Sequence, residues 1–217
     1  MGAHHSEHKI MDEIICHFPY AVFSVAFSLI VLNFMDFVAV GKDSSNLEPI
    51  WFGLFHSFHF MHITFAAVGT LLSFSKLSKN LFRGLVLSAV TATGFCMLSD
   101  IVFPYLGGRL LGVPMTFHIC FFHEFANIIP FLIVGLLTGM ALSKHDHGSK
   151  GTFGLWSHFA HIFVSSLASS FYMVSNGFND WSNQIGYVFL VLIVAVVIPC
   201  TLSDVAAPMF LAKIGRR

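Results

Sequence analysis

A short polar motif occurs twice in this otherwise apolar sequence. Residues 96–104 are Cys-Met-Leu-Ser-Asp-Ile-Val-Phe-Pro and residues 200–208 are Cys-Thr-Leu-Ser-Asp-Val-Ala-Ala-Pro, a separation of 104 positions. The aspartates of the two copies are Asp100 and Asp204. A cysteine and an aspartate four positions apart lie on the same face of a helix. Each copy can therefore present a thiol and a carboxylate side by side, and both groups bind metals.

Histidines recur at matching positions in the same two halves. The segment FGLFHSFH at 52–59 corresponds to FGLWSHFAH at 153–161, and IIC at 14–16 corresponds to HIC at 118–120. Histidines three positions apart also share a helix face. The chain is therefore predicted to be a duplicated unit in which each half carries histidine, aspartate and cysteine.

The composition places these polar groups in a membrane. Hydrophobic residues make up 56% of the chain and charged residues 10%, compared with about 25% charged in an average soluble domain. The charged residues separate six apolar runs, each long enough for the roughly 20 residues that cross a hydrocarbon core: 14–40, 50–74, 82–106, 116–142, 153–175 and 184–210. Because backbone groups in lipid must bond within their own segment, the runs predict an all-α integral membrane protein with six transmembrane helices.

The repeat predicts how the six helices are related. One unit covers about 14–108 and the other about 116–212, with a polar tail at 1–13, so that residues 1–217 form a single membrane domain. Because three helices are an odd number, the second unit enters the membrane from the opposite face. The expected architecture is two inverted three-helix repeats.

The positive charges predict the orientation in the membrane. With six spans both termini lie on one side, and of the 11 Lys and Arg residues only Lys42 and Arg109 lie in connections on the other side. Positive residues are enriched on the cytoplasmic side of membrane proteins. We therefore expect both termini, including the tail, to be cytoplasmic and the chain to lie in the plasma (inner) membrane. The spans leave no room for a soluble domain, and no nucleic-acid partner is expected.

Depth along the helices sorts the polar residues into two clusters, one near each face. With about 1.5 Å of rise per residue, the histidines of the second span lie about 9 to 18 Å from the outer face, and those of the fifth span lie about 8 to 12 Å from the cytoplasmic face. The outer cluster is predicted to contain His56, His59, His62, Asp100, His118, His123 and Glu124, with Cys96, Cys120 and Asp36 as further members. The cytoplasmic cluster is predicted to contain His17, His158, His161 and Asp204, with Cys16 and Cys200 as further members. Cysteines in apolar helices also pack simply as small hydrophobic side chains, which is a second interpretation of the four thiols.

The combination of imidazole, carboxylate and thiol in each cluster suits zinc, iron, cobalt, nickel or copper, and does not suit magnesium or calcium. Ionisable side chains inside a membrane face a bundle interior or a wet cavity and mark ion paths. Gly94 and Pro199 precede the motif cysteines and predict helix breaks at the same level, while Pro104 and Pro208 predict helix ends. The sequence thus predicts a transporter that passes a divalent transition-metal ion between the two clusters.

Two other functions fit the same residues. A membrane cytochrome that holds two b haems also places one histidine pair near each face. The candidate axial pairs are His59 or His62 with His123, and His161 with His17. Such a protein would be a membrane oxidoreductase, whereas a transporter is not an enzyme. The chain could also be a non-catalytic subunit of a larger membrane complex, and a homo-oligomer is compatible with all three functions.

Overall fold

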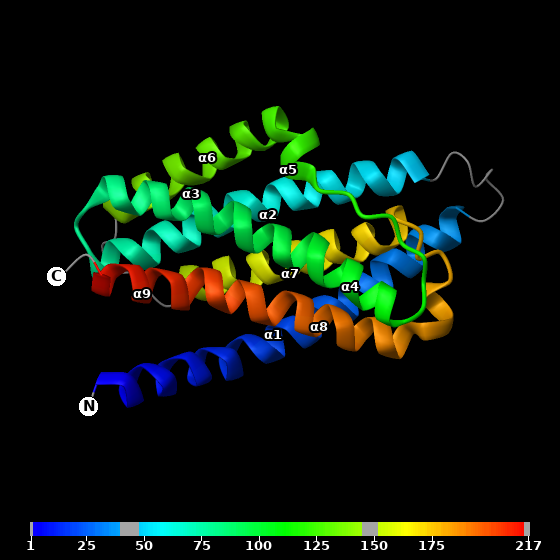
Figure 1. The fold of residues 1–217 in the computed structure, drawn as a ribbon, viewed down its shortest axis with the longest axis horizontal. Helices are drawn as coiled ribbons and strands as arrows, with labels where there is room; N and C mark the ends of the chain where they lie inside the picture. Colours follow the sequence, from blue (N-terminus) through cyan, green and yellow to red (C-terminus); the bar gives the residue numbers. More distant parts are fainter. Residues whose placement is uncertain (1, 40–47, 145–151, 215–217) are drawn as a thin grey trace.

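Long helices make up almost all of the protein (Figure 1). The computed structural model describes residues 2–39, 48–144 and 152–214, and no strand occurs within these ranges. In chain order the elements are α1 (Gly2–Ala39), α2 (Glu48–Leu77), α3 (Leu81–Met97), η2 (Leu98–Val102), α4 (Phe103–Leu110), α5 (Cys120–His123), α6 (Phe125–Lys144), α7 (Thr152–Ser175), η3 (Trp181–Gln184), α8 (Ile185–Thr201), η4 (Leu202–Ala206) and α9 (Ala207–Ile214). The all-helical prediction is confirmed for the described part of the chain.

Five helical segments are long and apolar enough to cross a membrane, which indicates a multi-pass membrane protein. They are His17–Val38, Glu48–Leu77, Leu81–Leu110, Phe125–Lys144 and Trp181–Thr201. The start of α1 and the end of α9 lie at one end of the bundle, which we call the terminal end (Figure 1). The start of α2 and the end of α4 lie at the opposite end, which we call the far end (Figure 1).

The expected fifth span, α7, is enclosed by other helices. Every residue from His161 to Asn176 is buried except Phe163, and α7 packs against α1, α2 and α8. Histidine and serine lower its hydropathy, so α7 is not among the five segments although it has 24 residues. Its polar side chains face protein: Ser170 Oγ lies 3.0 Å from Ser28 Oγ of α1. A helix surrounded by other helices in this way needs no lipid-facing apolar surface.

Both copies of the Leu-Ser-Asp motif form a π-helical turn. These turns are η2 and η4, and they occupy corresponding positions in the two copies. In η2 the N–H of Phe103 bonds to the carbonyl of Leu98, five residues earlier, and η4 has the same bond between Ala207 and Leu202. π turns are rare and often occur at functional sites.

The prolines that follow the motifs explain which backbone groups the π turns expose. Proline has no N–H, so each proline leaves one carbonyl of the preceding turn without its helical partner. The Ser99 carbonyl accepts a hydrogen bond from Ser169 Oγ of α7 at 3.0 Å. The Ser203 carbonyl accepts one from Thr70 Oγ1 of α2 at 3.4 Å. A hydroxyl from a neighbouring helix thus satisfies the same backbone position in both copies.

Several helix boundaries differ from the sequence-based expectation. The α3 helix continues through Gly94 and α8 continues through Pro199, so the irregular turns lie within the motifs rather than before them. Pro104 and Pro208 do not end their helices. Each lies in the first turn of the α-helix that follows the π turn, and a hydroxyl from a neighbouring helix replaces the hydrogen bond that the missing N–H cannot make. The polar tail expected at 1–13 is, from its second residue onward, part of α1.

The fourth span begins later than expected. It starts at Phe125 rather than near position 116, and the short helix α5 and an irregular segment precede it. The N–H of Thr116 donates to the carbonyl of Asn176 at 3.0 Å, and the N–H of His118 donates to Tyr172 Oη at 3.2 Å. These bonds hold the segment before α5 against the far end of α7, where it cannot continue the α6 helix.

Glycines allow α6 to lie close to α2. Gly135 and Gly139 form a Gly-x-x-x-Gly pattern on α6, which runs along the outside of the bundle (Figure 1). A Cβ atom on Gly135 would lie 2.7 Å from the carbonyl oxygen of Thr64, and one on Gly139 would lie 3.1 Å from Leu71 Cδ2. Small residues permit this close approach of membrane helices. Because α5 leads into α6, the contact also positions the α5 side chains beside α2.

Gly135→Ala is expected to destabilise the protein by about 1 to 3 kcal/mol, because the added methyl group would collide with the α2 backbone rather than with a movable side chain. Gly53→Ala on α2 is the matched control, since nothing lies within 4 Å of a Cβ atom at that position. Thermal or denaturant unfolding in detergent measures both variants. Equal stability of the two variants would contradict the close packing of α6 on α2.

Candidate metal centre

The polar network is centred on Asp100, which lies in η2 and is completely buried. Its Oδ2 accepts hydrogen bonds from His59 Nδ1 at 2.9 Å and from His62 Nδ1 at 2.7 Å. Its Oδ1 accepts hydrogen bonds from Ser99 Oγ at 2.6 Å and from Ser165 Oγ at 2.9 Å. Four donors therefore satisfy a carboxylate that has no access to solvent, which is the condition for keeping it charged in an apolar bundle.

These contacts determine how the two histidines are protonated. A carboxylate accepts hydrogen bonds, so His59 and His62 carry a proton on Nδ1. In the tautomer that carries its single proton on Nδ1, each ring directs the lone pair of Nε2 away from Asp100. Histidine ligands of metals commonly donate the other ring N–H to a carboxylate, which fixes the ring and increases its basicity. Asp100, expected from the sequence as a ligand, lies behind the histidines and orients them.

A group of three metal-binding side chains lies in front of His62. His62 of α2, His161 of α7 and Cys200 of α8 place their ligand atoms within 4.8 Å of one another, and we call them the central triad. The two Nε2 atoms are 2.7 Å apart, and Cys200 Sγ is 3.9 Å from His62 Nε2. All three side chains are buried, and Cys96 of α3 lines the same narrow space. Three helices thus bring two imidazoles and a thiol to one point.

The central triad fits a tetrahedral metal ion with small adjustments. Zinc binds imidazole nitrogen at about 2.0 Å and thiolate sulfur at about 2.3 Å, which separates tetrahedral ligand nitrogens by about 3.3 Å. The two histidine nitrogens would therefore move apart by about 0.6 Å from their hydrogen-bond distance. Two imidazoles with a thiolate suit a transition metal such as zinc, and magnesium or calcium prefers oxygen ligands.

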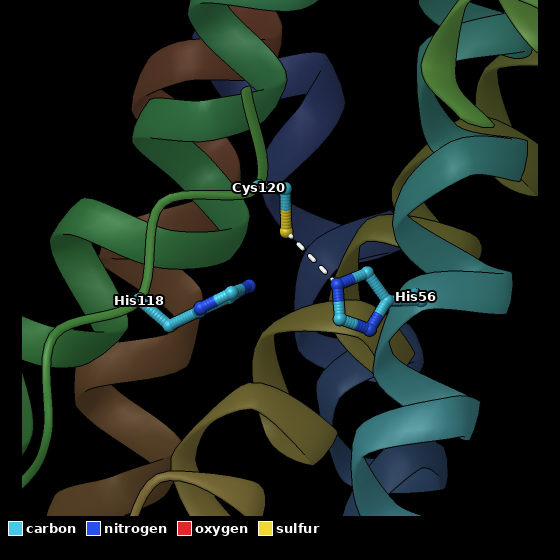
Figure 2. Close-up of side chains that lie close together, drawn as sticks. All are labelled: His56, His118 and Cys120. Atoms are coloured by element: carbon cyan, nitrogen blue, oxygen red, sulfur yellow. Dashed lines mark hydrogen bonds between the residues drawn. The ribbon is translucent and has the colours of Figure 1, made fainter. Parts of the chain in front are cut away.

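A second group lies nearer the far end of the bundle. His56 of α2, His118 of the irregular segment before α5, and Cys120 of α5 also place their ligand atoms within 4.8 Å of one another, and we call them the far triad. Cys120 Sγ is 3.3 Å from His56 Nε2, and the His118 ring points toward both residues from the other side (Figure 2). His56 Nδ1 donates to the carbonyl of Phe52 at 2.9 Å, which leaves its Nε2 as the acceptor or metal-binding atom.

In the far triad, both His118 and Cys120 are uncharged. Burial lowers the pKa of His118 below its usual value, and neighbouring His123 lowers it further. His118 is therefore neutral at physiological pH, and its Nε2 has no hydrogen-bond partner among the described residues. Burial raises the pKa of Cys120 to about 12, so that its thiol keeps its proton until a cation displaces it.

A histidine pair lies on the other side of the central triad, toward the terminal end. His17 Nε2 of α1 is 3.2 Å from His158 Nδ1 of α7, and the two rings meet edge to face with centroids 4.9 Å apart. His158 precedes His161 by three residues and so lies about one helical turn from the central triad. We call these two residues the terminal pair.

The remaining predicted site residues lie elsewhere or outside the described side chains. His123 is exposed and stacks on His118 with centroids 5.4 Å apart, and Glu124 accepts a hydrogen bond from Asn127. Asp36 accepts a hydrogen bond from the indole N–H of Trp181 at 2.8 Å. The side chains of Cys16 and Asp204 lie outside the part of the chain that the structure describes.

The division into one cluster at each face differs from the structure. His62, expected in the outer cluster, lies against His161 and Cys200, both expected in the cytoplasmic cluster. The reason is the thickness of the membrane: His62 at about 18 Å from one face and His161 at about 12 Å from the other reach the same level in a hydrocarbon core of about 30 Å. The contacts of His161 with His62 and of His17 with His158 also differ from the axial haem pairs expected from the sequence.

Two serines of the network were not predicted from the sequence as site residues. Ser165 binds Asp100 Oδ1, and Ser169 binds the Ser99 carbonyl. The sequence does contain a pattern that indicates them. Two Ser-Ser pairs, at 165–166 and 169–170, lie about one helical turn apart on the span that carries His161. Hydroxyl groups repeated on one face of a membrane helix indicate a buried polar contact.

Comparison with known proteins gives no match. No protein-family model, no curated protein and no solved structure matches this chain. The residues of the two triads, and the network that orients them, are therefore the basis for assigning a function.

Asp100→Asn is expected to weaken metal binding at the central triad about 10- to 100-fold, because the amide no longer fixes the tautomer of His62. Asp36→Asn is the control, since Asp36 accepts a hydrogen bond from Trp181 and belongs to neither triad. Titration of the purified, folded variants with Co²⁺, followed by the part of the thiolate-to-metal absorption band that is lost in Cys200→Ala, measures the affinity of the central triad. An unchanged affinity in Asp100→Asn would show that the carboxylate has no role in metal binding.

Proposed function

We propose that the protein transports a divalent transition-metal ion across the membrane. The central triad is the observation that carries this proposal. Its two imidazoles and one thiol come from three different helices, lie buried within the bundle, and are backed by a carboxylate that orients one imidazole. Ionisable groups are costly inside a membrane bundle and are associated with ion paths, relays and substrate sites.

Charge balance supports a divalent rather than a monovalent cation. A divalent ion bound to the Cys200 thiolate and neutral His62 and His161 has a net charge of +1, and the Asp100 carboxylate behind His62 compensates it. The whole assembly is then neutral, which is the favourable state for a group of charges in a low-dielectric interior. Metal binding and the loss of the thiol proton occur together at such a site.

The distribution of ligands along the bundle supports transport rather than a purely structural metal site. The far triad lies on one side of the central triad and the terminal pair lies on the other. A structural site needs only one closed set of four ligands. Successive sets along one path allow an ion to enter at one end and leave at the other.

We further propose that the six expected spans, with α7 as the fifth, form two inverted three-helix repeats. The two π turns support a duplicated origin, because both follow the same motif and each exposes a serine carbonyl to a hydroxyl from a neighbouring helix. Irregular helices near the middle of inverted repeats are a common feature of transporters. The excess of Lys and Arg on the side of the termini supports a cytoplasmic location for both termini in the plasma (inner) membrane.

The haem alternative has less support. Two axial imidazoles on opposite sides of one iron lie about twice a metal–nitrogen bond apart, or about 4 Å, with the porphyrin between them. The Nε2 atoms of His62 and His161 are 2.7 Å apart. A visible spectrum of the purified protein distinguishes the two functions, since a strong porphyrin band would contradict the transport proposal.

Cys200→Ala is expected to reduce Zn²⁺ or Co²⁺ flux in proteoliposomes by about tenfold or more, because it removes the only anionic ligand of the central triad. Val197→Ala is the control: it also shortens a buried side chain of α8 but removes no ligand. Flux is followed with a metal-sensitive dye inside the vesicles. If the wild-type protein binds Co²⁺ but transports no metal across the vesicle membrane, it is a metal-binding subunit and not a transporter.

A further inference from the structure

His59 has a metal-binding atom that neither triad uses. The side chain is completely buried, and its Nδ1 donates to Asp100 Oδ2. Its Nε2 has no hydrogen-bond partner among the described residues. A buried polar atom without a partner is costly, so such an atom in a polar network calls for an explanation.

The position of His59 on α2 suggests what its Nε2 does. His56 belongs to the far triad and His62 to the central triad, and His59 lies three residues from each. Three residues of helix correspond to about 4.5 Å, so the two triads are about 9 Å apart along α2. Metal–ligand bonds are only about 2.0 to 2.3 Å long. An ion that leaves His56 cannot reach His62 without a ligand between them.

We propose that His59 Nε2 is a transit ligand that carries a divalent transition-metal ion between the far triad and the central triad. This inference rests on the transport function proposed above and adds the route. In each step a metal–nitrogen bond to one imidazole forms as the bond to the previous one breaks. His59 binds the ion through the lone pair of Nε2 while its Nδ1–H stays hydrogen-bonded to Asp100. The Cys120 thiolate regains a proton when the ion leaves it and the Cys200 thiol loses one when the ion arrives, so the protons balance and no electron is transferred.

The surroundings of His59 fit a transit position better than a storage site. The ring of Phe55 stacks on it with centroids 5.4 Å apart, and Phe60 lies on another side with centroids 6.0 Å apart. Among the described residues, the groups of metal-binding side chains do not include His59, whereas each triad offers three ligand atoms. A single imidazole holds an ion weakly, and conduction through successive sites requires positions that release the ion readily.

Two substitutions separate a transit ligand from a structural partner of Asp100. His59→Asn retains an N–H group close to the position of Nδ1, which can still donate to Asp100, and removes the ligand at Nε2. His59→Gln places an amide oxygen near the position of Nε2, where it can act as a weak ligand, and loses the donor close to Asp100. A transit role predicts lower metal flux in His59→Asn than in His59→Gln. A structural role predicts the reverse order.

The experiment uses full-length protein in proteoliposomes with Co²⁺ or Zn²⁺ as the only metal. We expect His59→Asn to reduce flux by about tenfold or more while equilibrium Co²⁺ binding at both triads stays within about threefold of wild type. Flux in His59→Asn within twofold of wild type, or the loss of Co²⁺ binding at the central triad, would overturn the transit role.

Failure of the transport proposal gives a different result from failure of the transit inference. If wild-type protein shows no flux, the rate at which purified protein loads Co²⁺ into the central triad decides the role of His59. The part of the thiolate-to-metal absorption band that is lost in Cys200→Ala, recorded in stopped flow, reports this rate. Loading slowed by about tenfold in His59→Asn supports the transit ligand, and loading at the wild-type rate contradicts it.

Discussion

The buried carboxylate of Asp100 is the constraint on which the rest of the structure depends. A charged group inside an apolar bundle must be surrounded by donors, and here the donors come from α2, from α7 and from η2 itself. The requirement brings α2 and α7 against the middle of the third span. It also explains why α7 contains serine where a lipid-facing helix would contain leucine, since the α7 hydroxyl groups serve the third span.

At the π turn η2, one neighbouring helix supplies hydrogen bonds both to a backbone carbonyl and to the Asp100 carboxylate. The proline after the motif leaves the Ser99 carbonyl without a helical partner, and Ser169 satisfies it from α7. The same helix, one turn earlier, provides Ser165 for the carboxylate. The third span therefore contacts α7 through both its backbone and its aspartate, and α7 carries His161 to the central triad. Helix packing and ligand position are thus parts of one hydrogen-bond network.

Sequence reasoning could predict the class of fold and most residues of the candidate centre, because a membrane imposes simple rules on length and polarity. It could not predict the π turns, because these depend on which hydroxyl of a neighbouring helix donates a hydrogen bond to the carbonyl that the proline leaves without a partner. It also missed the late start of α6, which follows from tertiary bonds of Thr116 and His118. The prediction that His62 belongs to a separate outer cluster was wrong, because His62 lies with His161 and Cys200. The predicted depths of His62 and His161 already placed these two residues at one level.

The location of Asp100 behind the histidines, rather than among the ligands, is compatible with the proposed transport of an ion. A carboxylate bound directly to the metal would hold it at one point and would add a bond that must break at each step. His59 and His62 instead share one oxygen of Asp100, through Nδ1 distances of 2.9 Å and 2.7 Å. An ion on the Nε2 atom of either ring lies one imidazole away from the same negative charge. On the proposed route, the electrostatic compensation would therefore change little between the two positions, and the barrier between them would be low.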